Sequence, residues 1–362
     1  MSKIQLVIIG GFLGSGKTTS ILNIANYLIG QGKKVGVVTN DQGADLVDTN
    51  FLKLKGLTAV EVTDGCFCCN FDEFLDRIEK LSKLNMPDVI LAEPVGSCTD
   101  LIATIYKPLK AKKVQSIEIK PFSVIADPKR LKKLILDKSS NFHAEINYLF
   151  KKQLEEADII ALNKIDLLSK EEKEDLIQFI KGNFKNAELL AISAKENINI
   201  KQWIEMIFTK ETAENTLDID YEIYGQAEAH LGWLNLTAAV DSTVKIDINK
   251  VISEISDKLR KEFYKVNGEI AHFKLLAVSG IDWAKASISD ISQQLSFDKR
   301  AQERSTNWDI VLNIRADMDE QKLLEIIKRI LKESIEQKEW TLSISNIQCF
   351  KPKKPNPTYR IS

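Results

Sequence analysis

The sequence lacks the features that mark membrane proteins, secreted proteins and nucleic-acid binders. No apolar run among the 362 residues approaches the length that a membrane span needs. The first residues, 1–3, lead straight into an apolar strand, so we expect no signal peptide. Lys and Arg number 50 and Asp and Glu 51, and a net charge of −1 argues against a general polyanion binder. We therefore expect no nucleic-acid partner and no membrane partner.

Cysteine and histidine are both scarce. The five cysteines are too few and too clustered for a disulfide framework, so a reducing cytoplasm is the expected location. The three histidines are scattered, and we interpret each as structural. We detect no internal repeat, and the length favours two or three domains.

The stretch Gly11–Thr19 reads GFLGSGKTT and matches the phosphate-loop pattern G-x-x-x-x-G-K-S/T. An apolar run at 4–9 precedes it, and apolar residues at helical spacing follow over 20–28. A chance glycine turn is the alternative, but both flanks have the strand and helix context that the pattern requires. Such glycines let backbone N–H groups point into one concavity that holds a phosphate chain. The residues expected to bind phosphate are Gly11, Gly14, Ser15, Gly16, Lys17, Thr18 and Thr19.

Strands and helices alternate through the first half of the chain. Helices are expected at 20–28, 71–84 and 170–181, and buried strands at 4–9, 34–39, 58–63, 88–92, 116–126, 157–162 and 187–192. This alternation predicts an α/β fold with a doubly wound, mostly parallel sheet. Ligands bind beyond the carboxyl ends of such strands. Because the polar motifs all fall at these ends, we expect them to converge in space.

The pattern changes after about residue 210. We predict a first domain over 1–210, a polar linker over 211–228, a second domain over 229–350 and a basic, proline-rich tail over 351–362. The order β-α-β, β-α-β suggests that the smaller second domain is α+β and ferredoxin-like, with a further strand at 283–289. The segment 292–306 is interpreted as a charged loop or loose helix, and the tail as disordered or extended.

A base-reading motif follows the strand at 157–162. Asn163-Lys164-Ile165-Asp166 looks like the NKxD motif of GTPases, and Ser193-Ala194-Lys195 follows the next strand. An ionised aspartate only accepts hydrogen bonds, and guanine offers it two adjacent donors that adenine lacks. The tetrapeptide alone is common by chance, but beside a phosphate loop it favours GTP over ATP.

Magnesium prefers hard oxygen ligands, and the Thr18 hydroxyl supplies one. Glu93 follows an apolar strand, and Gly96 is expected to let the backbone close on a γ-phosphate. A solvated, mobile loop explains any one aspartate after the second strand equally well. The candidates for further ligands are Asp41, Asp45, Asp48 and Glu93.

The most distinctive feature is the three thiols of Cys66-Phe67-Cys68-Cys69. Thiolates select soft ions such as Zn²⁺ over Mg²⁺, and a three-thiolate set leaves a fourth position open, which suits ion transfer. The alternatives are buried thiols, a redox pair or a disulfide. Cys98 is either a fourth ligand or a small core residue, and Cys349 is expected in the core.

Four motifs together resemble the CobW-type metallochaperone GTPases, relatives of the nickel-insertion GTPases for urease and hydrogenase. They are GGFLGSGKTT at 10–19, GCFCC at 65–69, EPVG at 93–96 and NKID at 163–166. The resemblance implies GTP hydrolysis and delivery of a transition metal, zinc or cobalt before nickel, to a client metalloprotein or cofactor pathway. It also implies that Cys66, Cys68 and Cys69 bind the metal, that Glu93 and Gly96 sense phosphate, and that Asn163 and Asp166 read guanine.

The chain departs from that family in three places. Residues 40–43 read NDQG instead of Asn-Glu-x-Gly, so the Asp41 carboxylate reaches less far toward a metal. No histidine-rich segment is present, which makes bulk metal storage unexpected. The His-Pro ending is replaced by PNPT at 355–358, which suggests a different client, such as a corrinoid-pathway protein.

The hypothesis is a metal-gated GTPase switch in which the phosphate and thiol sites bias one two-state element. Hydrolysis is expected to use Lys17, Glu93 and either Asp41 or Asp48, the last two as candidates for positioning water. No clear arginine finger is visible, so we expect slow turnover unless a partner or the second protomer of a homodimer contributes. The alternatives are a GTPase chaperone without metal transfer, a nucleotide-gated interaction module and an ATP-using kinase.

Overall fold

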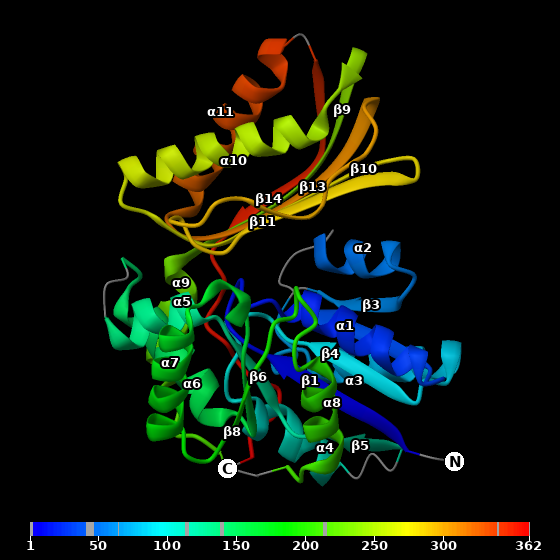
Figure 1. The fold of residues 1–362 in the computed structure, drawn as a ribbon, viewed down its shortest axis with the longest axis vertical. Coiled ribbons are helices and arrows are strands. Elements are labelled where there is room, and N and C mark those ends of the chain that lie inside the picture. The colour runs from blue at the N-terminus through cyan, green and yellow to red at the C-terminus, as the bar shows by residue number, and fades with distance from the viewer. Residues whose placement is uncertain are drawn as a thin grey trace.

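The computed structural model describes residues 3–40, 47–63, 65–112, 116–137, 141–212, 216–338 and 340–361. Two sheets form its framework, a parallel sheet in the first half of the chain and an antiparallel sheet in the second (Figure 1). The antiparallel sheet carries its helices on the face away from the first half, and its other face lies over the parallel sheet's end (Figure 1). Within the described ranges, no helix is long and apolar enough to cross a bilayer.

The first sheet has the order β3-β2-β4-β1-β6-β7-β8, with β5 pairing to β1, and the registered pairs are parallel. The strands are β1 (Ile4–Gly10), β2 (Val35–Asn40), β3 (Thr58–Val62), β4 (Val89–Glu93), β5 (Ile117–Ile119), β6 (Ser123–Ala126), β7 (Ile159–Leu162) and β8 (Glu188–Ala191). β2, β4, β6 and β7 are buried along their whole length because helices cover both faces of the sheet. The predicted doubly wound α/β fold is confirmed.

Helices cover this sheet on both faces (Figure 1). They are α1 (Lys17–Gly30), α2 (Val47–Leu54), α3 (Phe71–Asn85), α4 (Lys107–Ala111), α5 (Pro128–Leu131), α6 (Ala144–Glu156), α7 (Lys170–Asn183), α8 (Ile200–Thr209) and α9 (Tyr221–His230). The sequence analysis predicted no helix at α2, where Val47, Phe51 and Leu52 form one buried helical face.

The second sheet has the order β12-β11-β10-β13-β9-β14. Its elements are β9 (Leu231–Ile246), α10 (Ile248–Lys265), β10 (Glu269–Ser279), β11 (Asp282–Ile288), β12 (Ser296–Lys299), β13 (Ser305–Asp317), α11 (Glu320–Ser334) and β14 (Thr341–Phe350). The order β10-β13-β9-β14 with two β-α-β crossovers is the ferredoxin-like arrangement. The hairpin of β11 and β12 extends it at one edge. The segment 292–306, interpreted as a loop or loose helix, therefore contains a strand.

Two segments connect the halves of the molecule. α9 lies largely within the predicted linker and packs on α6, with Tyr224 and Ala227 in the core of the first half. The tail after β14 runs back over the first half, where the Ile361 N–H donates to the Ala103 carbonyl at 2.9 Å. The tail is therefore extended and held by hydrogen bonds. The exact domain boundaries stay a prediction.

Candidate nucleotide and metal site

The loop between β1 and α1 has the backbone that a phosphate cradle requires. Gly11, Gly14 and Gly16 have φ of 135°, 78° and 101°, a region that glycine adopts readily. A Cβ on Gly16 would lie 2.5 Å from the Asn163 Nδ2 atom. The Lys17 ammonium donates to the Gly11 carbonyl at 2.9 Å, so it curls back over the loop. These positions are therefore restricted to glycine by backbone and by contact.

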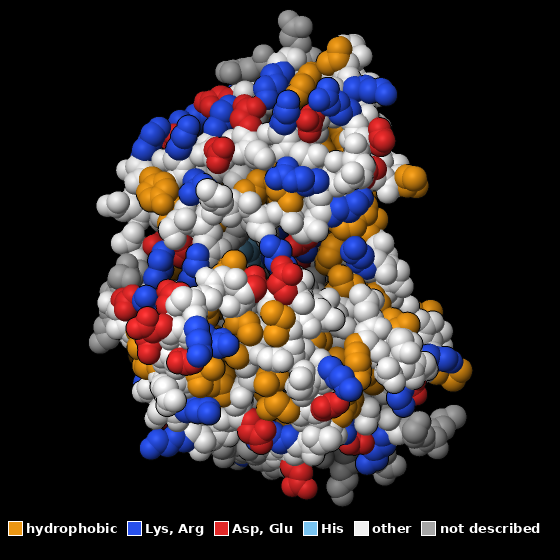
Figure 2. Space-filling model, viewed as in Figure 1, with side chains coloured by type: hydrophobic (Ala, Val, Ile, Leu, Met, Phe, Trp, Pro, Cys, Tyr) orange, Lys and Arg blue, Asp and Glu red, His pale blue; other side chains and the backbone are white. Residues whose placement is uncertain are grey.

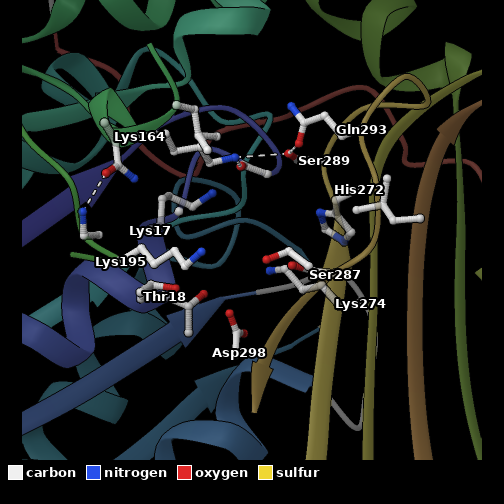
Figure 3. Close-up of a pocket in the computed structure, with 18 of the residues that line it drawn as sticks. Lys17, Thr18, Lys164, Lys195, His272, Lys274, Ser287, Ser289, Gln293 and Asp298 are labelled. Carbon is white, nitrogen blue, oxygen red and sulfur yellow. Dashed lines mark hydrogen bonds between the residues drawn. The ribbon is translucent and has the colours of Figure 1, made fainter. Parts of the chain in front are cut away.

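A cavity of about 460 Å³ opens above this loop. Figure 2 shows the molecule hollowed between its two halves, with acidic and basic side chains around the hollow. Figure 3 shows that the second sheet supplies one wall, facing Lys17 and Thr18. The predicted residues that line the cavity are Gly14, Gly16, Lys17, Thr18, Thr19, Asp48, Glu93, Asn163, Lys164, Asp166, Ala194 and Lys195.

Asn163 holds the phosphate loop and the 193–195 turn together. Its amide donates to the Ser15 carbonyl at 2.9 Å, and its Oδ1 accepts from the Ala194 N–H at 2.9 Å. Asn163 is only 2% exposed. Because both ends of this amide are bound by protein, Asn163 braces the site. Of the two residues expected to read guanine, Asp166 is the one with an exposed side chain.

Asp166 is the exposed carboxylate at this end of the cavity. Its Oδ1 accepts from the Ser193 hydroxyl at 2.6 Å, which fixes the carboxylate's orientation. Lys164 donates to the Gly14 carbonyl at 2.8 Å and to the Asp127 carboxylate at 2.6 Å. The NKID segment is therefore anchored to the phosphate loop and leaves one carboxylate to face a ligand.

Oxygen ligands gather at the other end, beside Lys17. The Thr18 hydroxyl donates to the Glu93 carboxylate, whose oxygens both lie 3.1 Å from it. Burial and the neighbouring Asp48 charge raise the pKa of Glu93 to about 7. Asp48 Oδ1 is buried and has no hydrogen-bond partner among the described residues. This set of hard oxygens fits Mg²⁺. Asp41 and Asp45 lie outside the described residues.

The turn after Glu93 contacts the phosphate loop. A Cβ on Gly96 would lie 2.7 Å from the Leu13 side chain and 3.0 Å from the Leu13 nitrogen. From the other side, the Gln153 amide donates to the Gly96 carbonyl at 2.9 Å and to the Cys98 carbonyl at 2.8 Å. The turn 93–98 is thus clamped between the loop and α6.

The three predicted metal ligands form one cluster. The Cys66 sulfur lies 2.7 Å from that of Cys68 and 3.0 Å from that of Cys69, and all three sulfurs lie within 4.8 Å of one another. Hydrogen bonds from the neighbouring thiols hold the pKa of Cys66 well below its usual range, while those thiols' own pKa values are raised, that of Cys69 to about 12. Cys66 is therefore the thiol that ionises first.

Cys98 lies beside this cluster, where the neighbouring Cys66 thiol and burial raise the pKa of the Cys98 thiol. It is buried in the same core as Val95 and Leu13. Because Cys98 ends the turn that begins at Glu93, a single six-residue segment touches both the oxygen cluster and the thiol cluster.

The tail covers the thiol cluster from outside. The Asn356 N–H donates to the Cys69 sulfur at 3.3 Å. The Thr358 N–H donates to the Cys68 carbonyl and its hydroxyl to the Cys69 carbonyl, both at 2.8 Å. The Tyr359 ring packs edge-on against Phe71 at 5.2 Å. Cys68 and Cys69 are therefore in direct contact with a segment almost 290 residues away in the sequence.

A second group of possible ligands lies away from the cavity. The His143 and His230 rings stack at 3.6 Å, and His143 Nδ1 lies 2.8 Å from both Asp317 oxygens. The sequence reading treated the histidines as scattered, and these two are in fact in contact. His143 is half-exposed, unlike the buried thiols.

Sequence reasoning missed the wall contributed by the second sheet. It comprises His272, Lys274, Lys285, Ser287, Ile288, Ser289, Ser292, Gln293, Gln294, Ser296 and Asp298. The signal was the alternation within 270–278, where polar His272 and Lys274 interrupt an otherwise apolar strand. In the structure, the face of β10 that carries His272 and Lys274 lines the cavity.

The parallel sheet and the glycine loop that leads into α1 define a P-loop nucleotide-binding protein. Residues 5–190 match the family model described as CobW/HypB/UreG, nucleotide-binding domain. The chain belongs to this family, as the four sequence motifs predicted.

Three curated relatives show how far the similarity extends. The chain is 33% identical over 186 residues to a zinc chaperone CobW of Sinorhizobium sp., covering 46% of this chain and 52% of the relative. It is 32% identical over 190 residues to the zinc chaperone YeiR of Escherichia coli strain K12, covering 51% and 53%. It is 25% identical over 271 residues to the zinc-regulated GTPase metalloprotein activator 1 of Dictyostelium discoideum, covering 64% and 52%. The chain thus spans about half the length of the curated relatives it matches.

Proposed function

We propose that the protein is a GTP-hydrolysing metallochaperone that binds a transition metal ion at Cys66, Cys68 and Cys69 and releases it to a client. The observation that carries this proposal is the turn 93–98, which presents Glu93 to the phosphate end and Cys98 to the thiols. The names of the zinc-chaperone relatives support zinc as the ion, with cobalt or nickel as the alternatives.

Guanine selection is assigned to Asp166. Its carboxylate faces the cavity and accepts from Ser193, and it retains lone pairs for the two adjacent donors of guanine. Adenine lacks these two donors, and sites of this kind discriminate against a base that lacks them by about 10⁴-fold. Lys195 and Lys164 flank the same end of the cavity.

Hydrolysis is assigned to the residues around Lys17. The bond from a water oxygen to the terminal phosphorus forms as the bond from that phosphorus to the bridging oxygen breaks. GDP leaves with that electron pair, and the water proton passes to the released phosphate. Lys17 and the loop N–H groups stabilise the charge on the phosphoryl oxygens, and Asp48 orients the water. When Mg²⁺ is bound by Thr18, Asp48 and Glu93, it neutralises phosphate charge.

The metal ion is the cargo. Cys66 is the thiol that ionises first, and three sulfurs leave a position at which a client's ligand can attack the ion. Movement of the turn 93–98 when the terminal phosphate leaves would shift Cys98 and loosen the neighbouring thiols. The client is a metalloprotein or a corrinoid-pathway protein, and the free thiols fit a reducing cytoplasm. A homodimer remains part of the proposal.

The decisive experiment measures zinc affinity in two nucleotide states. Wild type is compared with Cys66→Ala/Cys68→Ala/Cys69→Ala, each with GDP and with a non-hydrolysable GTP analogue. We expect the triple variant to lose tight zinc binding and wild-type affinity to differ about tenfold between nucleotides. The His143→Ala/His230→Ala variant is the control and should keep both properties. Equal affinity in all samples contradicts metal delivery and leaves a GTPase chaperone without metal transfer.

A further inference from the structure

The second sheet places positive charge in the nucleotide cavity. Lys274 on β10 and Lys285 on β11 line the cavity wall, opposite Lys17 and Thr18. Figure 3 shows Lys274 and His272 projecting from the sheet toward the phosphate loop. A ligand held by the loop would therefore also face the second half of the chain.

Lys274 is the best placed of these cations. Its ammonium forms an ion pair with Asp48 at 2.5 Å, and its side chain is 17% exposed. The charge of Lys274 also acts on the two groups at the phosphate end, since it adds to the burial that lowers the pKa of Lys17 and opposes the rise in that of Glu93. Two ammonium groups thus share one partly buried cavity with the carboxylates of Asp48 and Glu93, and a phosphate bound there would meet positive charge from both halves of the chain.

His272 gives an independent indication of a ligand. Both ring nitrogens lack a hydrogen-bond partner in the part of the chain that the structure describes, although the residue is only 5% exposed. An imidazole buried without partners is costly, and native structures seldom keep one without a function. Because His272 lies two residues from Lys274 on the same face of β10, the two side chains are presented to one ligand.

We propose, as an extension of the proposed GTP hydrolysis, that Lys274 is a catalytic residue that contacts the terminal phosphate and stabilises the charge developing on it. The ammonium keeps its protons throughout, and no bond to it forms or breaks. A phosphate oxygen competes with Asp48 for this ammonium, and the exchange releases Asp48 to orient the attacking water. The second half of the chain therefore supplies the cation that GTPases of other classes take from an arginine.

The competing explanation is that Lys274 only ties the two halves together through Asp48. A purely structural ion pair would affect stability and would lower the affinity for all nucleotides equally. A phosphate contact would instead act on GTP more than on GDP, and on hydrolysis most of all. The ratio of the two affinities therefore separates these roles.

The test compares Lys274→Met with Lys274→Arg and with Lys299→Met. Lys299 is the matched control, because it forms a 2.8 Å ion pair with Asp282 on the same sheet but does not line the cavity. We expect Lys274→Met to slow single-turnover GTP hydrolysis about 100-fold, a modest value for a missing transition-state cation. Its preference for a non-hydrolysable GTP analogue over GDP should fall about tenfold, the value of one charge-assisted hydrogen bond. Lys274→Arg should recover part of both, and Lys299→Met should match wild type.

Removal of Lys274 takes away the ion-pair partner of Asp48, so a second comparison separates the loss of this ion pair from the loss of a phosphate contact. Asp48→Asn is compared with Asp48→Asn/Lys274→Met, and the double variant should prefer the GTP analogue over GDP about tenfold less than Asp48→Asn does. Lys274→Met hydrolysis within about threefold of wild type overturns this inference and leaves the proposed function intact. An equal loss of affinity for GDP and for the GTP analogue also overturns the inference, and shows that Lys274 only connects the two halves through Asp48. A wild-type protein that binds no GTP overturns the proposed function and this inference together.

Discussion

The Gln153 amide donates to the Gly96 carbonyl at 2.9 Å and is 2% exposed. Substitution by leucine leaves two carbonyls of the turn 93–98 without their donor, which costs about 1–3 kcal/mol. We expect Gln153→Leu to lower the free energy of unfolding by that amount and to reduce the nucleotide dependence of zinc affinity. Chemical denaturation and zinc titration with GDP and a GTP analogue measure both. Asn183→Leu, at an exposed amide that bonds within its own helix, should change neither.

Gly96 and Gly182 should respond to alanine in opposite directions. A Cβ at Gly96 collides with Leu13 and pushes the turn away from the phosphate loop, so Gly96→Ala should weaken GTP binding at least about tenfold. Gly182 lies in α7 with nothing within 4 Å of a Cβ, so Gly182→Ala should stabilise by about 0.5–1 kcal/mol. Nucleotide titration and thermal melting measure these effects. If Gly96→Ala and Gly182→Ala have equal GTP affinity and equal melting temperature, the contact between Gly96 and Leu13 is unimportant.

Glu156 should make stability depend on pH. Burial raises its pKa from 4.5 to about 8, so between these values the folded state holds a proton that the unfolded state has lost. Its stability contribution is therefore present below about pH 4.5 and is lost as pH rises toward 8, at up to about 1.4 kcal/mol per pH unit. Glu156→Gln should flatten this slope, as measured by denaturant unfolding at pH 5, 6, 7 and 8. Glu155→Gln on the same helix is the control, and parallel slopes for all three proteins would refute the assignment.

The tail should slow metal release. Thr358→Pro removes the N–H that bonds to the Cys68 carbonyl and the hydroxyl that bonds to the Cys69 carbonyl. We expect zinc transfer to a chromophoric chelator to speed up about tenfold, because two lost hydrogen bonds correspond to about 1–3 kcal/mol. Thr358→Ser keeps both bonds and should behave as wild type. If the proline variant releases zinc at the wild-type rate, the tail does not guard the cluster.

Asp166 should set base specificity. Asparagine at this position offers an amide N–H₂ where guanine needs an acceptor, so Asp166→Asn should weaken GTP about 100-fold or more. The Asp166→Asn variant should instead bind more tightly a purine nucleotide that carries a carbonyl in place of the guanine amino group. Competition titrations with both nucleotides test this, with Asp175→Asn on α7 as the control. An unchanged preference for GTP would place base recognition elsewhere.

The sequence predicted what short-range patterns determine. The glycine loop and its flanking elements lie within about 25 residues, and their hydrophobic periodicity specifies them locally. The GTPase sheet followed from the same periodicity. α2 was missed because polar residues surround its three buried apolar residues.

Long-range contacts explain what the sequence did not predict. Lys274 meets Asp48 across 226 positions, and no local pattern in one sequence encodes that pairing. The position of the tail was not predicted, for the same reason. Its proline-rich composition predicts an extended backbone but not the surface on which that backbone lies.

Asn163 spans the phosphate loop and the 193–195 turn with both ends of one amide. Substitution of Asn163 would remove both of these hydrogen bonds at once, whereas substitution of Asp166 would change only one proposed contact with the base. A lineage that exchanged one nucleobase for another would therefore accumulate its substitutions at 166 and retain asparagine at 163. Substitution at 163 would therefore disturb the scaffold, whereas substitution at 166 would change which nucleotide is bound.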